Sequence, residues 1–550
     1  MKSLTPILLG GALMACLSCV ETDRLIGGNL IPTSSQYAVY SAEIPITDIE
    51  MRMADSLSGY SNSAITIGAI RDDIFGLDER ESAVTLVPLY DTLRFGNVQK
   101  INSFTFKAGF DTTSVSQEGN ERILQRVYVN ELSSGLKIRE LIDANDCVNQ
   151  VSHGTESIVK GTPIINGADD LTFEFTEDYA WKLIHDTDGL VLSKDMDKFF
   201  EKFPGIYIRT DTPSGNGGRI NTFKVQMNYN SSSYYLEDNY GELNITSVFD
   251  EEKGPVDTSF FFYYGALKYT RLDSLVNNYS NGTFPQYAIN FTKHSSRSLA
   301  GKATDRILVE GGSGLKPVIA ARDLREMVIR TIQDTLAQNG RPTADYSKAI
   351  INKATVVLPF DMSTNYKDLD LLFPPRLSPT CRIWTDTTST YMGLTDSSSE
   401  NADKGNINRS NCWYSPDITY HLQQVIMKDE DDKGFLTGNY DIWMLLMNVQ
   451  ETTTSSSSSN SDMSEYLQYL AYQNYYNSMY GGYGYSSGSY YNNYYSYMLA
   501  AMYASGSQTT TSKSYELDKD SYYNATLYGP QATDTKRRPK LKITFSIPKE

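Results

Sequence analysis

The chain has 550 residues, and its 66 acidic residues outnumber its 49 basic residues, which gives a net charge of −17 at neutral pH. Nucleic-acid phosphates and anionic membrane surfaces repel an acidic protein, so nucleic acid is not an expected partner. A chain this long exceeds what one hydrophobic core normally supports, and we expect two or three domains.

The N-terminus has the pattern of an export signal. An apolar run over 4–17 follows Lys2, and it is too short to cross a bilayer as a helix. Small residues lead from this run into two cysteines, as in bacterial lipoprotein signals, where the cysteine becomes the acylated N-terminus. Residues 1–18 are therefore interpreted as a lipoprotein signal peptide.

Two cysteines compete for the lipid. Cys19 is preferred because Glu21 and Asp23 follow it, and acidic residues in this place resemble the surface-export signal of Bacteroidota lipoproteins. Cys16 is the alternative, because the residue three positions before it is the more apolar. Two acyl chains anchor a protein stably, so we expect 19–35 to be a lipid-anchored linker. An ordinary secreted protein with a chance cysteine is the remaining alternative.

Strand patterns dominate the rest of the chain. Short segments rich in β-branched and aromatic residues are bounded by turn residues, and several alternate between apolar and polar positions. They cover 64–70, 84–90, 101–108, 126–132, 171–176, 205–210, 220–227 and 242–248. The better helical patterns lie over 177–186 and 324–338. We predict a mostly β protein of jelly-roll-like β-sandwiches with a few short helices.

The order of the predicted elements repeats along the chain. In the first half, two strands, a strand leading into a helix and two further strands lie at 101–106, 127–132, 170–184, 203–210 and 220–227. In the second half the same order lies at 351–360, 381–386, 417–426, 438–447 and 540–548. We therefore expect two tandem sandwich domains, over 36–250 and 251–550.

A Ser/Thr/Tyr-rich insertion of low complexity lies inside the second predicted domain, over 452–514, and flexible linkers at 452–461 and 505–514 border it. Between the linkers, tyrosines recur every three or four residues and glycines separate two helical stretches, which predicts a helical hairpin. Tyrosine offers a large contact area at low entropic cost, so a partner protein or the lipid headgroup layer is an expected contact; a disordered insertion is the alternative. The candidate contact residues are Tyr466, Tyr469, Tyr472, Tyr476, Tyr480, Tyr490, Tyr494 and Tyr497.

Motifs that would indicate catalysis are weak. The glycine-rich segment 309–318 lacks the spacing of a phosphate-binding loop, and we interpret it as a turn between a strand and a helical segment. The segment 429–440 matches a calcium loop only in its first residues, which favours a solvated acidic turn. No metal-ligand spacing relates the histidines, which are His153, His185, His294 and His421. We expect a non-enzyme without metal or cofactor.

Exposed aromatic rings are candidates for stacking on sugars. A buried anchor is nevertheless the expected role of each tryptophan, although Trp413 lies in a turn-like segment. The tryptophans are Trp181, Trp384, Trp413 and Trp443. Cys381 and Cys412 are interpreted as buried free thiols, with a disulfide between them as the alternative.

Several segments, in order, carry a resemblance to a known family. They are 26–32 (IGGNLIP), 55–76, 307–319 (ILVEGGSGLKPVI), 351–360 and 525–546. Together they resemble a Bacteroidota lipoprotein family catalogued as domain of unknown function 4270. The resemblance implies an outer-membrane lipoprotein of β-sandwiches that faces the cell exterior, and it supplies no activity, cofactor or catalytic residue. The tyrosine-rich insertion departs from it.

These features predict a non-enzymatic surface lipoprotein that acts on an outer-membrane β-barrel complex, in outer-membrane protein or lipoprotein assembly or in nutrient uptake. The link to a barrel rests on analogy with other surface lipoproteins. A glycan-binding surface lipoprotein and an adhesin are the alternatives.

Overall fold

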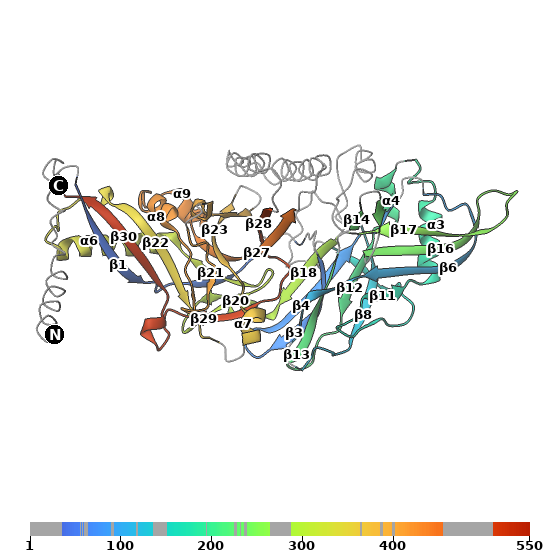
Figure 1. Cartoon of the computed structure of the whole chain (residues 1–550), viewed down its shortest axis with the longest axis horizontal. Coiled ribbons are helices and arrows are strands. Elements are labelled where there is room, and N and C mark those ends of the chain that lie inside the picture. Colours follow the sequence, from blue (N-terminus) through green and yellow to red (C-terminus); the bar gives the residue numbers. More distant parts are fainter. Residues whose placement is uncertain are drawn as a thin grey trace, which may run out of the picture.

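The computed structural model describes residues 36–55, 57, 59, 64–89, 93–116, 119–135, 151–193, 195–224, 228–230, 233–235, 239–264, 288–362, 366–384, 389–398, 402–454 and 510–549. Over these residues the protein is mostly β, with several antiparallel sheets, which confirms the predicted fold class at this level. Two groups of sheets lie side by side along the long axis of the molecule (Figure 1). Cys16, Cys19 and the eight candidate tyrosines lie outside the described residues.

Group 1 consists of a five-stranded and a nine-stranded sheet. The five-stranded sheet has the order β11 (Leu171–Glu174), β6 (Asn97–Ala108), β16 (Asn239–Val248), β17 (Val256–Tyr263) and β5 (Val87–Pro88). The nine-stranded sheet has the order β10 (Ile164–Ile165), β8 (Gln125–Leu132), β12 (Ile206–Thr210), β4 (Gly76–Val84), β3 (Ala64–Asp72), β13 (Gly217–Lys224) and β7 (Phe110–Ser116), with β18 (Ala288–His294) paired to β4 and β9 (His153–Ser157) paired to β8.

One hydrophobic core joins the two sheets of group 1. Phe104 and Phe106 of β6 belong to the same cluster of buried residues as Val129 of β8 and Ile208 of β12. Helices α3 (Glu177–Thr187) and α4 (Met196–Lys202) contribute to this core, the former through Leu183. Strand β16 alternates strictly between buried and half-buried residues, as a strand with one face on a core does.

Group 2 holds both ends of the described chain. Its five-stranded sheet has the order β1 (Tyr37–Pro45), β30 (Lys540–Pro548), β22 (Ile350–Pro359), β26 (Trp413–Tyr414) and β25 (Ile407–Asn408). Its seven-stranded sheet has the order β19 (Gly301–Lys302), β2 (Glu50–Met53), β21 (Leu315–Ile319), β27 (Ile442–Thr454), β23 (Leu377–Trp384) and β24 (Ser389–Gly393), with β28 (Thr510–Leu517) paired to β27. Strands β20 (Arg306–Glu310) and β29 (Asn524–Tyr528) form a separate pair; a further pair is β14 (Asn228–Asn230) with β15 (Ser233–Tyr235).

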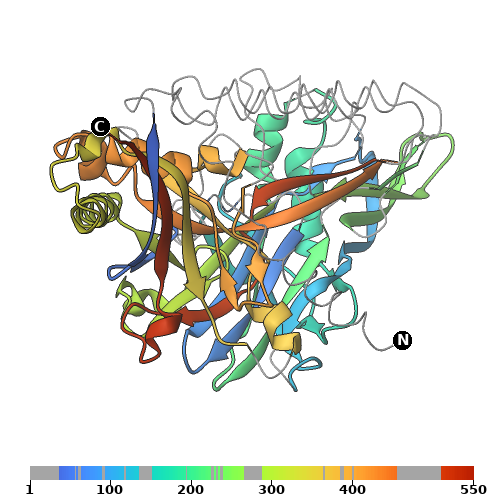
Figure 2. The ribbon, with the colours of Figure 1, turned by 60° about the vertical axis from the view of Figure 1, so that its left-hand side comes forward.

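Two helices of group 2 pack beside its five-stranded sheet (Figure 2). Helix α6 (Ala321–Gln338) buries one stripe of side chains at helical spacing, among them Leu324, Val328 and Ile332, in the core of group 2. The shorter helices are α7 (Tyr366–Leu372), α8 (Thr419–Ile426) and α9 (Lys433–Thr437). Where a strand leading into a helix was predicted at 417–426, the structure has helix α8, and Asp417 forms only an isolated bridge with Thr355.

Sheet membership does not follow the predicted division of the chain at 250. Strand β1 pairs along its whole length with β30, so the start of the described chain completes a sheet made by its end. Strands β17 and β18 lie beyond residue 250 and pair with β16 and β4 of group 1. The two tandem domains remain a prediction.

The borders of the tyrosine-rich insertion differ from the flexible linkers that were predicted. Strand β27 extends to Thr454 and β28 begins at Thr510, and these two residues are Cα partners in an antiparallel ribbon. The Ser/Thr pattern suggested a linker, but threonine is also favoured in strands, and the described residues 452–454 of the first border pair with 510–512 of the second.

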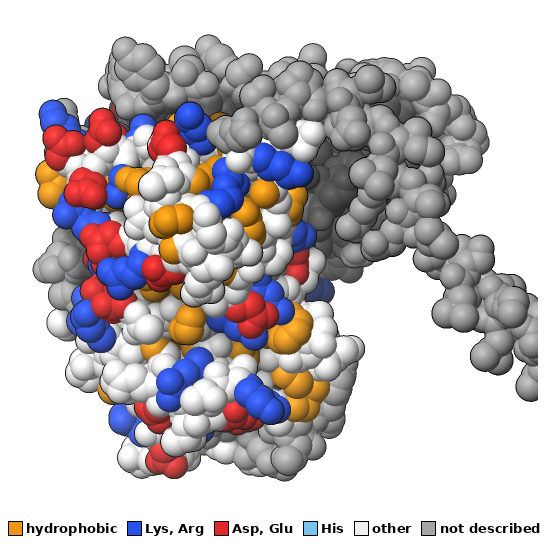
Figure 3. Space-filling model, turned by 90° about the vertical axis from the view of Figure 1, so that its left-hand side faces the viewer, with side chains coloured by type: hydrophobic (Ala, Val, Ile, Leu, Met, Phe, Trp, Pro, Cys, Tyr) orange, Lys and Arg blue, Asp and Glu red, His pale blue; other side chains and the backbone are white. Residues whose placement is uncertain are grey.

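At the end of the molecule formed by β1, β30 and α6, acidic and basic side chains are interspersed (Figure 3). Lys540 and Lys542 of β30 both form ion pairs with Glu43 of β1, at 2.8 and 3.5 Å. This face carries no field of a single sign, and it therefore lacks the basic footprint typical of nucleic-acid binding.

Candidate functional site

Strands β4 and β18 form a ladder whose two faces carry different polar groups. Cα partners in an antiparallel ladder share a face. Lys293 lies opposite Glu79, so these two side chains lie on one face, whereas His294 lies opposite Asp78 on the other. One face closes on group 2, and the other opens into a hollow.

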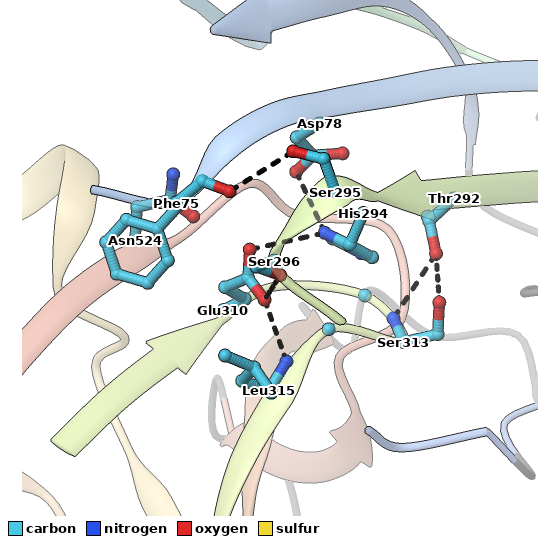
Figure 4. Close-up of polar contacts among 12 residues, drawn as sticks. Phe75, Asp78, Thr292, His294, Ser295, Ser296, Glu310, Ser313, Leu315 and Asn524 are labelled. Carbon is cyan, nitrogen blue, oxygen red and sulfur yellow. Dashed lines mark hydrogen bonds and ion pairs between the residues drawn. The ribbon is translucent and has the colours of Figure 1, made fainter. Parts of the chain in front are cut away.

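The closed face contains a fully buried ion pair. Arg80 Nη2 donates to Asp78 Oδ2 at 2.9 Å, and both side chains are almost completely excluded from solvent. The side chain of His294 is also buried, with its Nδ1 3.8 Å from Asp78 Oδ2 and 3.5 Å from Glu310 Oε1 (Figure 4). Glu310 ends β20, so this contact links group 1 with group 2.

The carboxylate of Glu310 is the centre of this contact. Its Oε2 accepts from Ser296 Oγ at 2.5 Å and from the Leu315 backbone N–H at 2.9 Å (Figure 4). Burial by itself raises the pKa of this carboxyl group. The nearby imidazole ring of His294 and the two donors together outweigh burial and lower the pKa below its usual value.

Lys316 organises the glycine-rich turn that follows. Its Nζ donates to the backbone carbonyls of Glu310, Gly312 and Gly314, at 2.6, 3.0 and 3.1 Å. Burial lowers the pKa of Lys316 to about 7, although Glu310 acts in the opposite direction. The turn joins β20 to β21, and not a strand to a helix as was predicted. A phosphate-binding loop points its N–H groups at the ligand, whereas here the carbonyls surround the protein's own ammonium group.

The segment before β29 and the first residue of β29 add further contacts between the groups. Asn290 of β18 donates to Asp520 Oδ1 at 2.7 Å, and Asn524 donates to Asp72 Oδ2 at 2.8 Å. Asp518 is buried, and burial raises the pKa of its carboxyl group. We call the buried set of Asp78, Arg80, His294, Glu310 and Lys316 the junction cluster, since it lies where the two groups meet. Its members are enclosed and contact one another, as groups that hold a fold together do.

The other face of the ladder lines a hollow of about 880 Å³. Strands β4, β8, β12 and β18 and the start of β9 form its walls. The charged side chains in these walls are Glu79, Glu81, Arg209, Asp211 and Lys293, and the aromatic ones are Tyr128, His153 and Tyr207. We call this feature the β4 hollow.

Most side chains of the β4 hollow are fixed by one another. Glu81 accepts a short hydrogen bond from the Tyr207 hydroxyl group and forms an ion pair with Lys293 at 2.7 Å. The ring of His153 stacks on the ring of Tyr207, with centroids 4.2 Å apart. These contacts hold the walls in place before any ligand enters.

Glu79 differs from its neighbours in the β4 hollow. Among the described residues, its carboxylate forms no hydrogen bond or ion pair. Burial raises its pKa, and the negative charges of Glu81 and Asp78 add to this effect, while Lys293 opposes it. Glu79 therefore presents an acceptor to the hollow that nothing in the described chain uses.

A smaller hollow of about 400 Å³ lies beside β2 in group 2, lined by Arg52, Arg297 and Arg382 among others. The Arg382 guanidinium group lies 4.3 Å from the ring centroid of Trp384 and pairs with Asp55 at 2.7 Å. The positive charge of Arg382 is therefore already neutralised by Asp55, and its guanidinium group already lies over the Trp384 ring.

The tryptophans and described cysteines are not among the residues that line the β4 hollow or form the junction cluster, and Trp443 lines the smaller hollow. Trp443 is buried as predicted, but Trp384 is 46% exposed, which contradicts the buried role expected for it. Trp181 and Trp413 are half-buried, and the Lys542 ammonium group lies 5.5 Å from the Trp413 ring centroid. Cys381 and Cys412 are free thiols; Cys381 is buried and Cys412 is half-buried.

His185, His421 and the acidic segment have structural roles. His185 stacks on Trp181 within α3, and His421 lies in α8. In the segment 429–440, Asp432 caps the N-terminus of α9 by accepting from the Gly434 N–H at 2.8 Å. A helix cap thus replaces the calcium loop that the first residues of this segment suggest.

The polar groups on the two faces of this ladder were not predicted from the sequence. The available signal was the run DERE at 78–81 inside a strand-like segment. Successive residues of a strand point to opposite faces, so four consecutive charges place two on each side of a sheet. Such a strand is too polar for an ordinary core and indicates polar sites on both faces.

Among the described residues, no group of three or more His, Cys, Asp or Glu side chains is arranged to hold a metal ion. Within the same part of the chain, none of the helices is both long enough and apolar enough to cross a bilayer. No family model, curated protein or solved structure matches the chain. The resemblance to domain of unknown function 4270 therefore remains a proposal.

Proposed function

We propose that this protein is a non-enzymatic lipoprotein of the outer membrane, anchored through Cys19, that serves as a binding or assembly subunit on an outer-membrane β-barrel complex. It faces the cell exterior and belongs to the family that its sequence resembles. Its described part acts as a scaffold of two sandwich-like units that presents surfaces to a partner.

The junction cluster is the observation that carries this proposal. An enzyme needs perturbed ionisable groups that face a cavity where substrate can enter. Here Arg80, Glu310 and Lys316 are almost completely buried. Arg80 pairs with Asp78, and the Glu310 carboxylate accepts from Ser296 and the Leu315 N–H. Lys316 donates to the backbone of the glycine-rich turn. These groups fasten one group of sheets to the other, which suits a scaffold better than a catalyst.

Affinity purification from native membranes tests this proposal. The full chain, carrying a C-terminal tag, is expected to co-purify with a β-barrel protein from outer membranes solubilised in mild detergents. Cys19→Ser should abolish the lipid and release the chain from the membrane, whereas Cys16→Ser is the matched control and should leave both unchanged. Mass spectrometry of the mature N-terminal peptide identifies the acylated residue. Recovery of the chain alone in every detergent would overturn the proposed barrel partner.

Saccharide binding is a second candidate function, and the β4 hollow favours it. The sequence suggested Trp413 for this role, but Lys542 lies over its ring. The β4 hollow instead combines aromatic rings with the unpartnered carboxylate of Glu79.

A further inference from the structure

We propose that the β4 hollow is a binding site for a neutral saccharide and that Glu79 is its principal hydrogen-bond acceptor. This inference rests on the second candidate function, and it is independent of whether the chain docks on a β-barrel. Three properties of the hollow carry it: the mixed signs of its charges, the free acceptor, and the aromatic ring of His153.

The charges in the hollow disfavour a strongly charged ligand. Glu79 and Asp211 would repel an anion and Arg209 would repel a cation, whereas the charge of Lys293 is already paired with Glu81. A ligand whose hydroxyl groups both donate and accept can satisfy groups of both kinds. The hollow measures about 880 Å³, within the range of roughly 300–1,000 Å³ that small-ligand sites occupy.

Glu79 supplies the acceptor that such a ligand needs. Glu81, on the same face, is already engaged by Tyr207 and Lys293. Glu79 is partly removed from water, and no described residue donates to it. Removing a carboxylate from water without a partner costs free energy, so a ligand hydroxyl group that donates to Glu79 recovers part of that cost.

The ring of His153 is the aromatic group of the hollow that suits the apolar face of a sugar ring, because Arg209 lies over Tyr128 and Tyr207 is buried. The Arg209 guanidinium group lies 4.6 Å from the ring centroid of Tyr128, its cross-strand partner, which fixes both side chains. His153 is half-buried, and its ring stacks on the ring of Tyr207. Aromatic faces carry partial negative charge and attract the C–H groups that line one side of many sugar rings.

The test uses the full mature chain in detergent on an array of neutral, acidic and amino oligosaccharides, followed by calorimetric titration of the sugars that bind. We expect binding to neutral sugars. Glu79→Gln preserves shape but removes the charged acceptor, and it should weaken binding by about tenfold to hundredfold. His153→Ala, at the edge of the sheet, should weaken it as well. Glu252→Gln, on an exposed turn, is the matched control and should bind as the unaltered chain does.

Three results would overturn the inference: a blank array, binding confined to charged sugars, and neutral-sugar binding that both Glu79→Gln and His153→Ala leave unchanged. Urea unfolding of Glu79→Gln and His153→Ala shows whether each variant is as stable as the unaltered chain. Sugar binding is compared for a variant whose unfolding midpoint equals that of the unaltered chain. Glu79→Gln should still co-purify with any barrel that the unaltered chain recovers. Loss of sugar binding with the barrel retained therefore separates this site from the first proposed function.

Discussion

His421 illustrates how burial alone sets the behaviour of a single residue in this protein. It lies in α8, and its Nε2 donates to the Tyr440 carbonyl oxygen at 3.0 Å. Burial lowers the pKa of His421 to about 4, and the hydrogen bond to Tyr440 opposes this shift only in part. The neutral ring is thus the form that the folded protein stabilises.

We expect His421 to make the protein less stable in mild acid. Below about pH 6.5 the unfolded chain binds a proton at this residue that the folded chain takes up only near pH 4. The stabilisation is therefore complete above pH 6.5 and is lost as the pH falls towards 4, with a slope of at most about 1.4 kcal/mol per pH unit. Urea unfolding of the unaltered chain and of His421→Gln, measured between pH 4 and pH 7.5, isolates this contribution.

His421→Gln retains a donor for the Tyr440 carbonyl group but cannot titrate. Above pH 6.5 the free energies of unfolding of the two proteins should differ by a constant amount. Below pH 6.5 the unaltered chain should lose stability relative to His421→Gln. A difference that stays the same from pH 7.5 to pH 4 would show that His421 titrates normally in the fold.

Other single residues depend on neighbours that the sequence does not reveal. Trp384 and Trp443 both follow an isoleucine in a strand, yet the first is exposed and the second is buried. Trp443 lies on β27, which has β21 and β23 on its two sides, whereas Trp384 is the last residue of β23. The position of a residue in its sheet, and not its type, decides the difference.

At the scale of elements, local signals located the helices, but a distant residue decided where one of them begins. Helix α3 starts after Thr176, whose side chain accepts from the Tyr179 N–H, and the predicted start at 177 agrees with it. Helix α6 starts at Ala321, earlier than the predicted 324, because Asp441 accepts from the Ala321 N–H at 3.0 Å. That cap comes from the residue that precedes β27, and it has no signature near the helix itself.

The glycine-rich turn at 311–314 is an element that we expect to tolerate substitution poorly. The Gly311 N–H donates to the Tyr523 carbonyl oxygen at 2.8 Å, and a β-carbon at this position would overlap the Ser521 carbonyl oxygen and lie 2.8 Å from Tyr523 N. These are backbone atoms that cannot move aside. Gly311→Ala should therefore destabilise the protein by about 1–3 kcal/mol, as overpacking does, measured from the midpoint of urea unfolding.

Gly215→Ala is the control for this prediction. A β-carbon at Gly215 meets no atom within 4 Å, and its backbone is not left-handed. We expect its midpoint to match that of the unaltered chain or to rise slightly. Equal midpoints for Gly311→Ala and Gly215→Ala would mean that the turn adjusts and does not fasten the two groups.

For the molecule as a whole, the pairing of distant strands predicts that the two groups of sheets fold together. Separate expression of 36–250 and 251–550 would take β18 from β4 and β1 from β30. It would also divide the junction cluster between two chains, leaving Arg80 and Asp78 without Glu310 and Lys316. We expect neither fragment alone to show near-ultraviolet circular dichroism or a cooperative unfolding transition.

Deletion of 455–509 is the matched control for the separated fragments. Thr454 and Thr510 are Cα partners, so an Asn-Gly turn can join them and close the ribbon. This shortened chain retains every strand pairing of the described residues and should unfold cooperatively. Independent folding of 36–250 would instead support the tandem domains that the sequence predicts.

The sequence by itself determined that the protein is mostly β and located several of its strands, because alternation of apolar and polar residues is a local pattern that a sheet with one buried face requires. It also indicated both strong helices. Only the tertiary structure decided which strands pair, since the pairing of β1 with β30 depends on contacts between opposite ends of the chain. The junction cluster and the β4 hollow depend on the tertiary structure for the same reason: the run 78–81 is polar on both faces, and only its neighbours from distant segments make one face closed and the other open.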